Sequence, residues 1–127
     1  MTKILSIVET AYRATIEEQD DTVLWFNHIL KNAGGDISVL LRSNAVNYAV
    51  RGQDASGLRF GDLSQDNPPQ IEWDVADLIT KGVPVYVLRE DAADRGLADG
   101  DLVGGVQKVS RRELPGLLDR FDQIWHW

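Results

Sequence analysis

The stretch VPVYVLREDAADRG, residues 83–96, decides the fold class of this 127-residue chain. Its first half is an uncharged run rich in valine, which is typical of a strand buried on both faces of a sheet. Its second half begins at Arg89-Glu90-Asp91 and predicts a short helix that ends at Gly96. A strand that passes directly into a helix is the building unit of parallel α/β sheets, and ligands bind at the carboxyl ends of their strands.

The same alternation continues along the rest of the chain. We expect strands over residues 3–8, 36–41, 83–88, 106–109 and 123–127, and helices over 22–33, 44–50, 71–82, 91–96 and from 110 onward. Strands that alternate with helices favour a parallel sheet with helices on both faces. The sequence therefore predicts an α/β fold, a three-layer α/β/α sandwich with a five-stranded parallel sheet, in a single domain over residues 1–127.

One segment interrupts this alternation. Residues 52–70 contain three glycines, three aspartates and the run Asn67-Pro68-Pro69, without helical or strand periodicity. Connections between elements are usually about 4–6 residues long, and longer ones are often functional or mobile. We predict a flexible insertion at 52–70, either a surface loop that is mobile or ordered by a partner, or a lid over a binding site.

Composition excludes several classes of function. The net charge is −7 and the basic residues are scattered, which argues against a nucleic-acid partner. No apolar run approaches the roughly 18 residues that a membrane span needs, and the first ten residues do not resemble a secretory signal. There is no cysteine, so disulfides, thiolate metal sites and a cysteine nucleophile are all excluded. We expect a cytoplasmic protein that does not contact membranes.

The sequence also lacks the usual patterns for cofactors and metals. Residues 9–13, which follow the first strand, contain no glycine that would let a backbone cradle a phosphate. His28 and His126 are the only histidines, and neither has a second ligand three or four residues away on the same face. We therefore predict no cofactor, no metal site and no catalytic residue.

The charged residues after the strand at 83–88 have a structural interpretation. Glu90 and Asp91 in a first helical turn complement the helix dipole, and Asp91 with Arg95 has the spacing of an ion pair along a helix. Ser43 is similarly interpreted as the N-cap of the helix that begins at Asn44.

The same strand end also has a functional interpretation. In this interpretation, Arg89 faces a crevice there and binds a small anion, helped by Tyr12 or Asn44 from neighbouring strand ends. The predicted ligand-binding residues are Tyr12, Asn44, Arg89 and Glu90.

The last strand carries Trp125 and Trp127 on one face and His126 on the other, because side chains alternate along a strand. We expect the two tryptophans to anchor the strand against a helix or to form an oligomer contact.

Several phrases resemble the DsrE/DsrF-like family, sulfur-relay proteins that include the Tus and Dsr subunits. The most telling is GVPVYVLREDAADRGLADGDLVGGVQKVSRRELPGLLDRFDQIWHW, residues 82–127. It has a Gly-Val-x-Val strand, a short helix with Arg-Gly-aliphatic, an Asp-Leu-x-x-Gly-Val link and a final strand with aromatics. ISVLLRSNAVNYAV, residues 37–50, is similar to the family's second strand and following helix, and Tyr12 lies where many members carry a tyrosine. The resemblance covers most of the chain except residues 52–70.

This resemblance implies a five-stranded α/β/α fold and assembly into trimers, hexamers or heteromers. In sulfur-transferring members, a cysteine just after the equivalent of Val83–Leu88 carries a persulfide. Here Arg89-Glu90-Asp91 occupy that region, and no cysteine is present elsewhere. Some relay subunits of the family also lack the cysteine and act as structural partners.

Three hypotheses for function follow. The first is a non-catalytic oligomeric binding or scaffold subunit linked to intracellular sulfur metabolism, either a homotrimer or hexamer or a heteromer with related cysteine-bearing subunits. The second is a sensor or carrier of a small anion or nucleotide-like ligand, with its pocket at the carboxyl ends of the strands. The third is an enzyme that uses Glu90 and Asp91 as acids.

Overall fold

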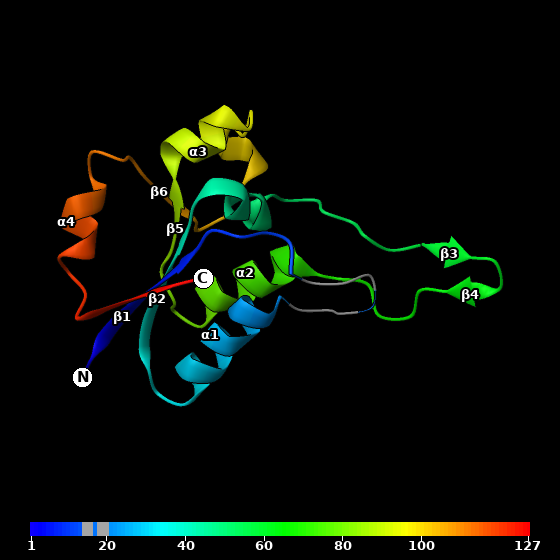
Figure 1. Ribbon diagram of the computed structural model, residues 1–127, viewed down its shortest axis with the longest axis horizontal. Helices are drawn as coiled ribbons and strands as arrows, with labels where there is room; N and C mark the ends of the chain where they lie inside the picture. The colour runs from blue at the N-terminus through cyan, green and yellow to red at the C-terminus, as the bar shows by residue number, and fades with distance from the viewer. Residues whose placement is uncertain (14–16, 18–20) are drawn as a thin grey trace.

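The computed structural model describes residues 1–13, 17 and 21–127. Strands, α-helices and two 3-10 helices (η) alternate along the chain (Figure 1): β1 (Lys3–Val8), α1 (Thr22–Asn32), β2 (Asp36–Leu41), η1 (Ser43–Ala49), β3 (Arg59–Phe60), β4 (Leu63–Ser64), α2 (Ile71–Thr80), β5 (Val85–Leu88), α3 (Arg89–Asp94), η2 (Asp99–Asp101), β6 (Gln107–Val109), α4 (Leu114–Leu118) and β7 (Gln123–His126).

Five of the strands form one parallel sheet in the order β6-β5-β2-β1-β7. Each neighbouring pair is parallel, and the register places Val8 opposite Leu41 and Val39 opposite Val85. The carboxyl ends of β1, β2 and β5 therefore meet at one edge, where the chain enters the connection after β1, η1 and α3. The predicted α/β fold with a five-stranded parallel sheet is confirmed.

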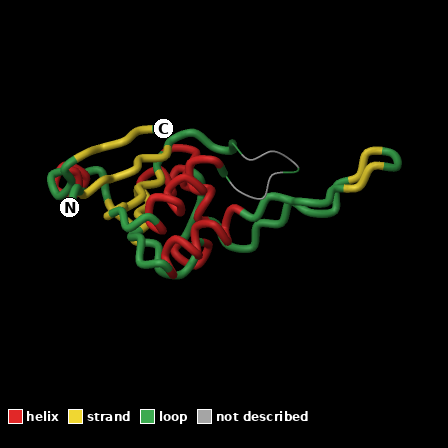
Figure 2. The backbone as a smooth tube through the Cα atoms, turned by 90° about the horizontal axis from the view of Figure 1, so that it is seen from below, coloured by secondary structure: helices red, strands yellow, loops and turns green. Residues whose placement is uncertain are grey.

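Alternation along the strands divides the core between the two faces of the sheet. Val39 and Leu41 of β2 pack with α1, α2 and η1, whereas Leu40 between them packs on the side of α4. The layers are unequal: α1 and α2 lie together on one face, and the five-residue α4 lies on the other (Figures 1 and 2). The interior strands β1, β2 and β5 carry buried apolar residues on both faces, and Ser6 and Ser38 are their buried polar residues.

The last strand is anchored as the sequence predicted. The ring of Trp125 stacks on Phe26 of α1 with centroids 6.2 Å apart, and the ring of Trp127 meets Phe26 edge-on at 6.0 Å. The indole nitrogen of Trp127 donates to Ser6 Oγ. His126 points to the opposite face, where its Nε2 lies 2.7 Å from a carboxylate oxygen of Glu9.

Several local predictions are wrong at their boundaries. The helix predicted over 91–96 is α3, Arg89–Asp94, and the helix predicted from residue 110 begins at Leu114. The strand predicted from residue 83 begins at Val85, because Pro84 has no N–H to donate to a neighbouring strand. The helix predicted from residue 44 is a 3-10 helix, and Ser43 is its first residue instead of its N-cap. Ser43 has a φ of 52°, so its backbone already turns at the position where a cap would be extended.

Residues 52–70, named the arm below, contain an antiparallel hairpin that the sequence analysis missed. β3 and β4 pair Arg59 with Ser64 and Phe60 with Leu63. The turn between them is Gly61-Asp62, and Gly61 has the positive φ of 63° that a two-residue hairpin turn favours. The arm extends well away from the sheet and its helices, which form the body of the molecule (Figures 1 and 2).

Gly105 fixes the link between η2 and β6 against α2. Its φ is 95°, and an added Cβ would lie 2.8 Å from Cγ2 of Ile79. We expect Gly105→Ala to lower the free energy of unfolding by about 2 kcal/mol, since the substitution adds both backbone strain and a clash. Urea denaturation measures this change.

Gly104→Ala is the matched control for that substitution. A Cβ at Gly104 would meet no described atom within 4 Å. Equal destabilisation by the two substitutions would contradict the explanation from the contact with Ile79.

Within the described ranges, 1–13, 17 and 21–127, no helix has the length and apolar character needed to cross a membrane.

Candidate functional site

Of the four predicted ligand-binding residues, Arg89 lines a cavity beside the sheet, at the start of α3. The cavity has a volume of about 320 Å³, is open to solvent on one side and is bordered by η2, the link over residues 102–106 and β6. Tyr12, Asn44 and Glu90 are not part of its lining. That these three residues share a ligand-binding crevice with Arg89 therefore stays a prediction.

Each of the three is engaged elsewhere at the carboxyl edge of the sheet. The Tyr12 hydroxyl donates to Gln53 Oε1 at 3.0 Å, and Tyr12 is half-exposed. Asn44 Oδ1 accepts two bonds from the Arg95 guanidinium, at 2.8 and 3.3 Å. The carboxylate of Glu90 accepts the Arg111 backbone N–H, at 2.8 and 3.1 Å.

Asp91 does not form the predicted ion pair with Arg95. Its carboxylate is buried and accepts the Ser43 backbone N–H at 2.6 Å and an Arg111 guanidinium N–H at 3.0 Å. Arg95 instead donates to the backbone carbonyl of Asp91. Ser43 and Arg111, which lie 48 and 20 residues away in the sequence, thus take the place of Arg95. Asp91 thereby connects η1, α3 and the turn after β6.

A second buried carboxylate, Asp21, lies near the end of β1. One oxygen accepts the N–H groups of Val23 and Leu24 and so caps α1, while the other accepts the Tyr48 hydroxyl at 2.7 Å. Burial, together with the bond to Asp21, raises the pKa of Tyr48 well above its usual value. Tyr48 therefore stays a hydrogen-bond donor at neutral pH. An aspartate directly before the predicted helix was the signal for this cap.

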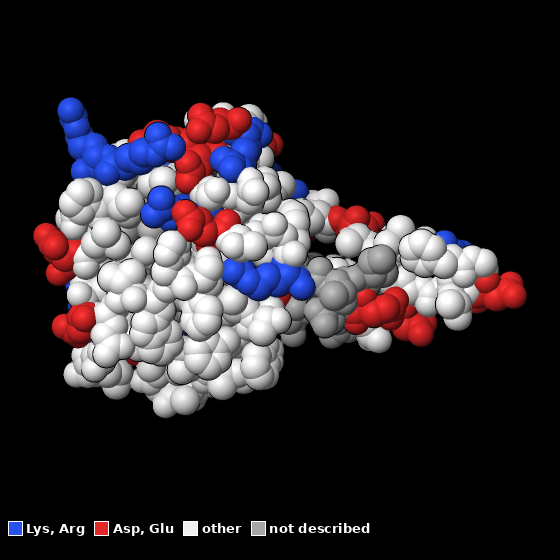
Figure 3. All heavy atoms as spheres, in the orientation of Figure 1, with Lys and Arg blue, Asp and Glu red and all other residues white. Residues whose placement is uncertain are grey.

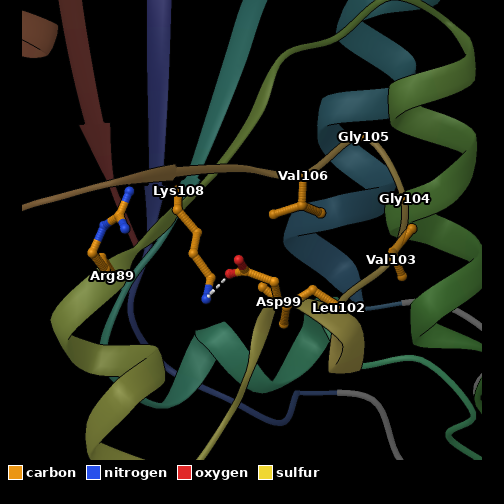
Figure 4. Close-up of a pocket in the computed structure, with 8 residues that line it drawn as sticks. All are labelled: Arg89, Asp99, Leu102, Val103, Gly104, Gly105, Val106 and Lys108. Carbon is orange, nitrogen blue, oxygen red and sulfur yellow. Dashed lines mark ion pairs between the residues drawn. The ribbon is translucent and has the colours of Figure 1, made fainter.

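The cavity beside Arg89 has a polar and an apolar side (Figure 4). Lys108 of β6 extends into it and ends 2.5 Å from a carboxylate oxygen of Asp99 on η2. Leu102, Val103 and Val106 line the other side with the backbone of two glycines. Neither Lys108 nor Asp99 was predicted to be part of a site, because the pattern at residues 99–101 indicated only a turn.

The two members of that ion pair differ sharply in exposure. The Lys108 side chain is 17% exposed, whereas that of Asp99 is 90% exposed. The hydrogen bond from Lys108 and its charge lower the pKa of Asp99, so that the carboxylate stays ionised at neutral pH. Lys108 is thus a nearly buried cation whose partner comes from the surface.

The arm carries a different kind of surface. Phe60 and Leu63 are 64% and 74% exposed, and Leu58 is also exposed. Leu58 lies on the same face of the hairpin as Phe60, two residues away. Large apolar side chains gathered on a projecting hairpin suit contact with another protein.

Among residues 1–13, 17 and 21–127, no group of three or more His, Cys, Asp or Glu side chains is arranged to hold a metal ion.

Comparisons with known proteins identify the fold. No family model matches the chain, and no curated protein matches its sequence. Among solved structures, the ychN protein from E. coli superposes with a TM-score of 0.76 at 21% identity, covering all of both chains.

Two further structures are similar over nearly the whole length. A protein of unknown function from Methanobacterium thermoautotrophicum has a TM-score of 0.62 at 16% identity, with 98% of this chain and 99% of that chain covered. A conserved protein of unknown function from Bacteroides thetaiotaomicron has a TM-score of 0.67 at 14% identity, with 98% and 95% covered. At such identities these likenesses show the fold alone, the α/β fold of the ychN protein.

Proposed function

We propose that this protein is a non-catalytic binding subunit that assembles with further copies of itself through the arm. The observation that supports this proposal is the exposed apolar face formed by Leu58, Phe60 and Leu63. The resemblance to the DsrE/DsrF-like family supports the same assembly, since it implies trimers and hexamers. The missing cysteine removes the persulfide chemistry of the sulfur-transferring members.

The arm is poorly stabilised by its own contacts. Its hairpin contains two residue pairs, and an isolated two-stranded hairpin is at best marginally stable in water. The described hydrogen bonds to the rest of the chain include those of Gln53 with Tyr12 and with backbone carbonyls of residues 47–50. The Gly52 N–H also bonds to Glu72, and the N–H groups of Asp66 and Asn67 bond to Glu17. Burial of the apolar face against another subunit supplies the missing stabilisation.

Charge favours a second copy as the occupant. The arm has three aspartates and one arginine, whereas the turn between β6 and α4 has the exposed pair Arg111-Arg112. Figure 3 shows acidic side chains along the arm and a group of basic ones at the other end of the molecule. Contacts between unlike ends of identical subunits are heterologous, and they close into rings when the rotation allows. A trimer or hexamer fits this arrangement.

Removing the apolar face of the arm is expected to dissociate the assembly. Phe60→Ser combined with Leu63→Ser deletes the two most exposed apolar side chains of the hairpin. The unmodified chain should sediment as a trimer or hexamer, and the double variant as a monomer with the same far-UV circular dichroism. Analytical ultracentrifugation over a range of concentrations, with native mass spectrometry, measures both.

A matched control uses the opposite face of the same hairpin. Arg59 pairs with Ser64 there, and Arg59→Ser changes the arm without touching Phe60 or Leu63. Assembly should survive this change. A monomeric unmodified chain, or a double variant that assembles like the unmodified chain, would refute the proposal.

A link to intracellular sulfur metabolism rests on the family resemblance. In that setting, a related cysteine-bearing subunit would supply the thiol that this chain lacks. Affinity purification from the native cytoplasm tests this heteromeric alternative: recovery of a related cysteine-bearing chain, in place of further copies of this one, would favour it.

A further inference from the structure

We propose that the cavity beside Arg89 binds a small organic oxyanion through Lys108. Without the ligand, Asp99 forms an ion pair with Lys108, and the ligand displaces Asp99 when it binds. The inference is independent of assembly through the arm. It rests on the contacts of Lys108, Asp99 and Arg89 and on the apolar side of the cavity.

Lys108 provides the principal charge of the site. The Lys108 side chain is 17% exposed, and its ammonium group lies beside one carboxylate, that of Asp99. The Asp99 carboxylate has the same chemistry as a carboxylate ligand. Because the Asp99 side chain is 90% exposed, it can turn into solvent without a large desolvation cost.

Arg89 adds a second cation to the same cavity. Its charge is felt by Asp99 and also by Glu113, whose carboxylate is bonded to Ser110. When the Asp99 side chain leaves, Lys108 and Arg89 remain in the lining without an acidic neighbour there. Two cations at one cavity favour an oxyanion, which accepts several charge-assisted hydrogen bonds.

The remaining lining sets the size and character of the ligand. Leu102, Val103 and Val106 add a smaller apolar part to a mainly polar lining, and about 320 Å³ accommodates more than a bare inorganic ion. Gly105 lets this part of the lining lie close to Ile79 of α2. The chemistry therefore fits a carboxylate, phosphate or sulfur oxyanion on a short apolar body.

The test is a titration monitored by amide chemical shifts at constant ionic strength. The probes are butyrate, propyl phosphate and propane sulfonate, which share the apolar body and differ in the oxyanion. Binding should shift the amides of residues 102–108, and the tightest probe identifies the class of oxyanion. Lys108→Gln should weaken that binding by about 10-fold or more, because it removes a charged hydrogen-bond donor.

Asp99→Asn provides the decisive variant. It alters an exposed side chain, so folding is preserved, and it removes the competitor for Lys108. Affinity should rise by about 2–5-fold, the range expected for release of a surface ion pair. The matched controls are Lys81→Gln and Asp77→Asn, exposed residues of α2 and its C-cap, which should leave the affinity unchanged.

Three results would overturn the inference. They are the failure of all three probes to shift residues 102–108 of the unmodified protein, unchanged or weaker binding by Asp99→Asn, and equal effects of Lys108→Gln and Lys81→Gln.

Discussion

Asp21→Ala is expected to lower the free energy of unfolding by roughly 1.5–5 kcal/mol, because one buried carboxylate serves two segments. Loss of the N-cap leaves the N–H groups of Val23 and Leu24 without their acceptor, which costs about 0.5–2 kcal/mol. Loss of the other oxygen leaves the buried Tyr48 hydroxyl without its acceptor, at a further cost of about 1–3 kcal/mol.

Urea denaturation separates these two contributions. Asp21→Asn retains a capping oxygen and should cost less than Asp21→Ala. In a Tyr48→Phe background, Asp21→Ala should also cost less than in the unmodified chain, since the hydroxyl is already absent. Asp77→Ala, on the exposed side of α2, serves as the control. If Asp21→Ala destabilised no more than this control, the two-segment role would be disproved.

Asp91→Ala is expected to lower the free energy of unfolding by about 2 kcal/mol. The substitution leaves the Ser43 N–H without its acceptor at 2.6 Å and releases the Arg111 side chain. Ser43 has a φ of 52°, a conformation that few residues other than glycine adopt, and the bond to Asp91 helps to hold it. For a chain of this size, the expected fall in melting temperature is about 8 °C.

The neighbouring acid offers a matched comparison for Asp91. Glu90 bonds to the Arg111 backbone N–H at the surface, so Glu90→Ala should cost less than about 1 kcal/mol. Scanning calorimetry of both variants gives the two shifts. Similar shifts would mean that burial and the bond to Ser43 do not distinguish Asp91.

The fold was predictable from the sequence because its strands are buried. In a parallel sheet with helices on both faces, residues such as Val39, Leu40 and Leu41 are all apolar, and such runs stand out between polar helices. The aromatic alternation at Trp125 and Trp127 likewise predicted which side chains meet α1. The predicted ends of strands were less accurate where a single missing hydrogen-bond donor sets them, as the absent N–H of Pro84 does at the start of β5.

The arm was missed because its hairpin is too short for periodicity. Two residue pairs give no measurable alternation, and the one local signal was Gly61-Asp62 between Phe60 and Leu63. Such a turn signal predicts a hairpin when the flanking strands are longer.

The contacts of the candidate site were hidden for a different reason. Helical spacing suggested that Asp91 forms an ion pair with Arg95. The Asp91 carboxylate is buried instead, and it accepts hydrogen bonds from Ser43 and Arg111, which are distant in the sequence. Lys108 was unremarkable in the sequence, since its environment is created by η2 and the link over residues 102–106 packing beside β6. Of the four predicted ligand-binding residues, Arg89 lines this cavity, and ligand binding by all four stays a prediction.

The separation of the arm from the core has a consequence for how the protein is made. Among the described residues, none from 52 to 70 belongs to either buried cluster, so the sheet and its helices gain little from the arm. Folding of the body is then unimolecular, whereas the proposed association through the arm would depend on concentration. A newly synthesised chain would reach its folded body first and carry an unprotected arm, open to proteases, until it meets another subunit. Its lifetime at low abundance would depend on the frequency of such encounters more than on the stability of the sheet.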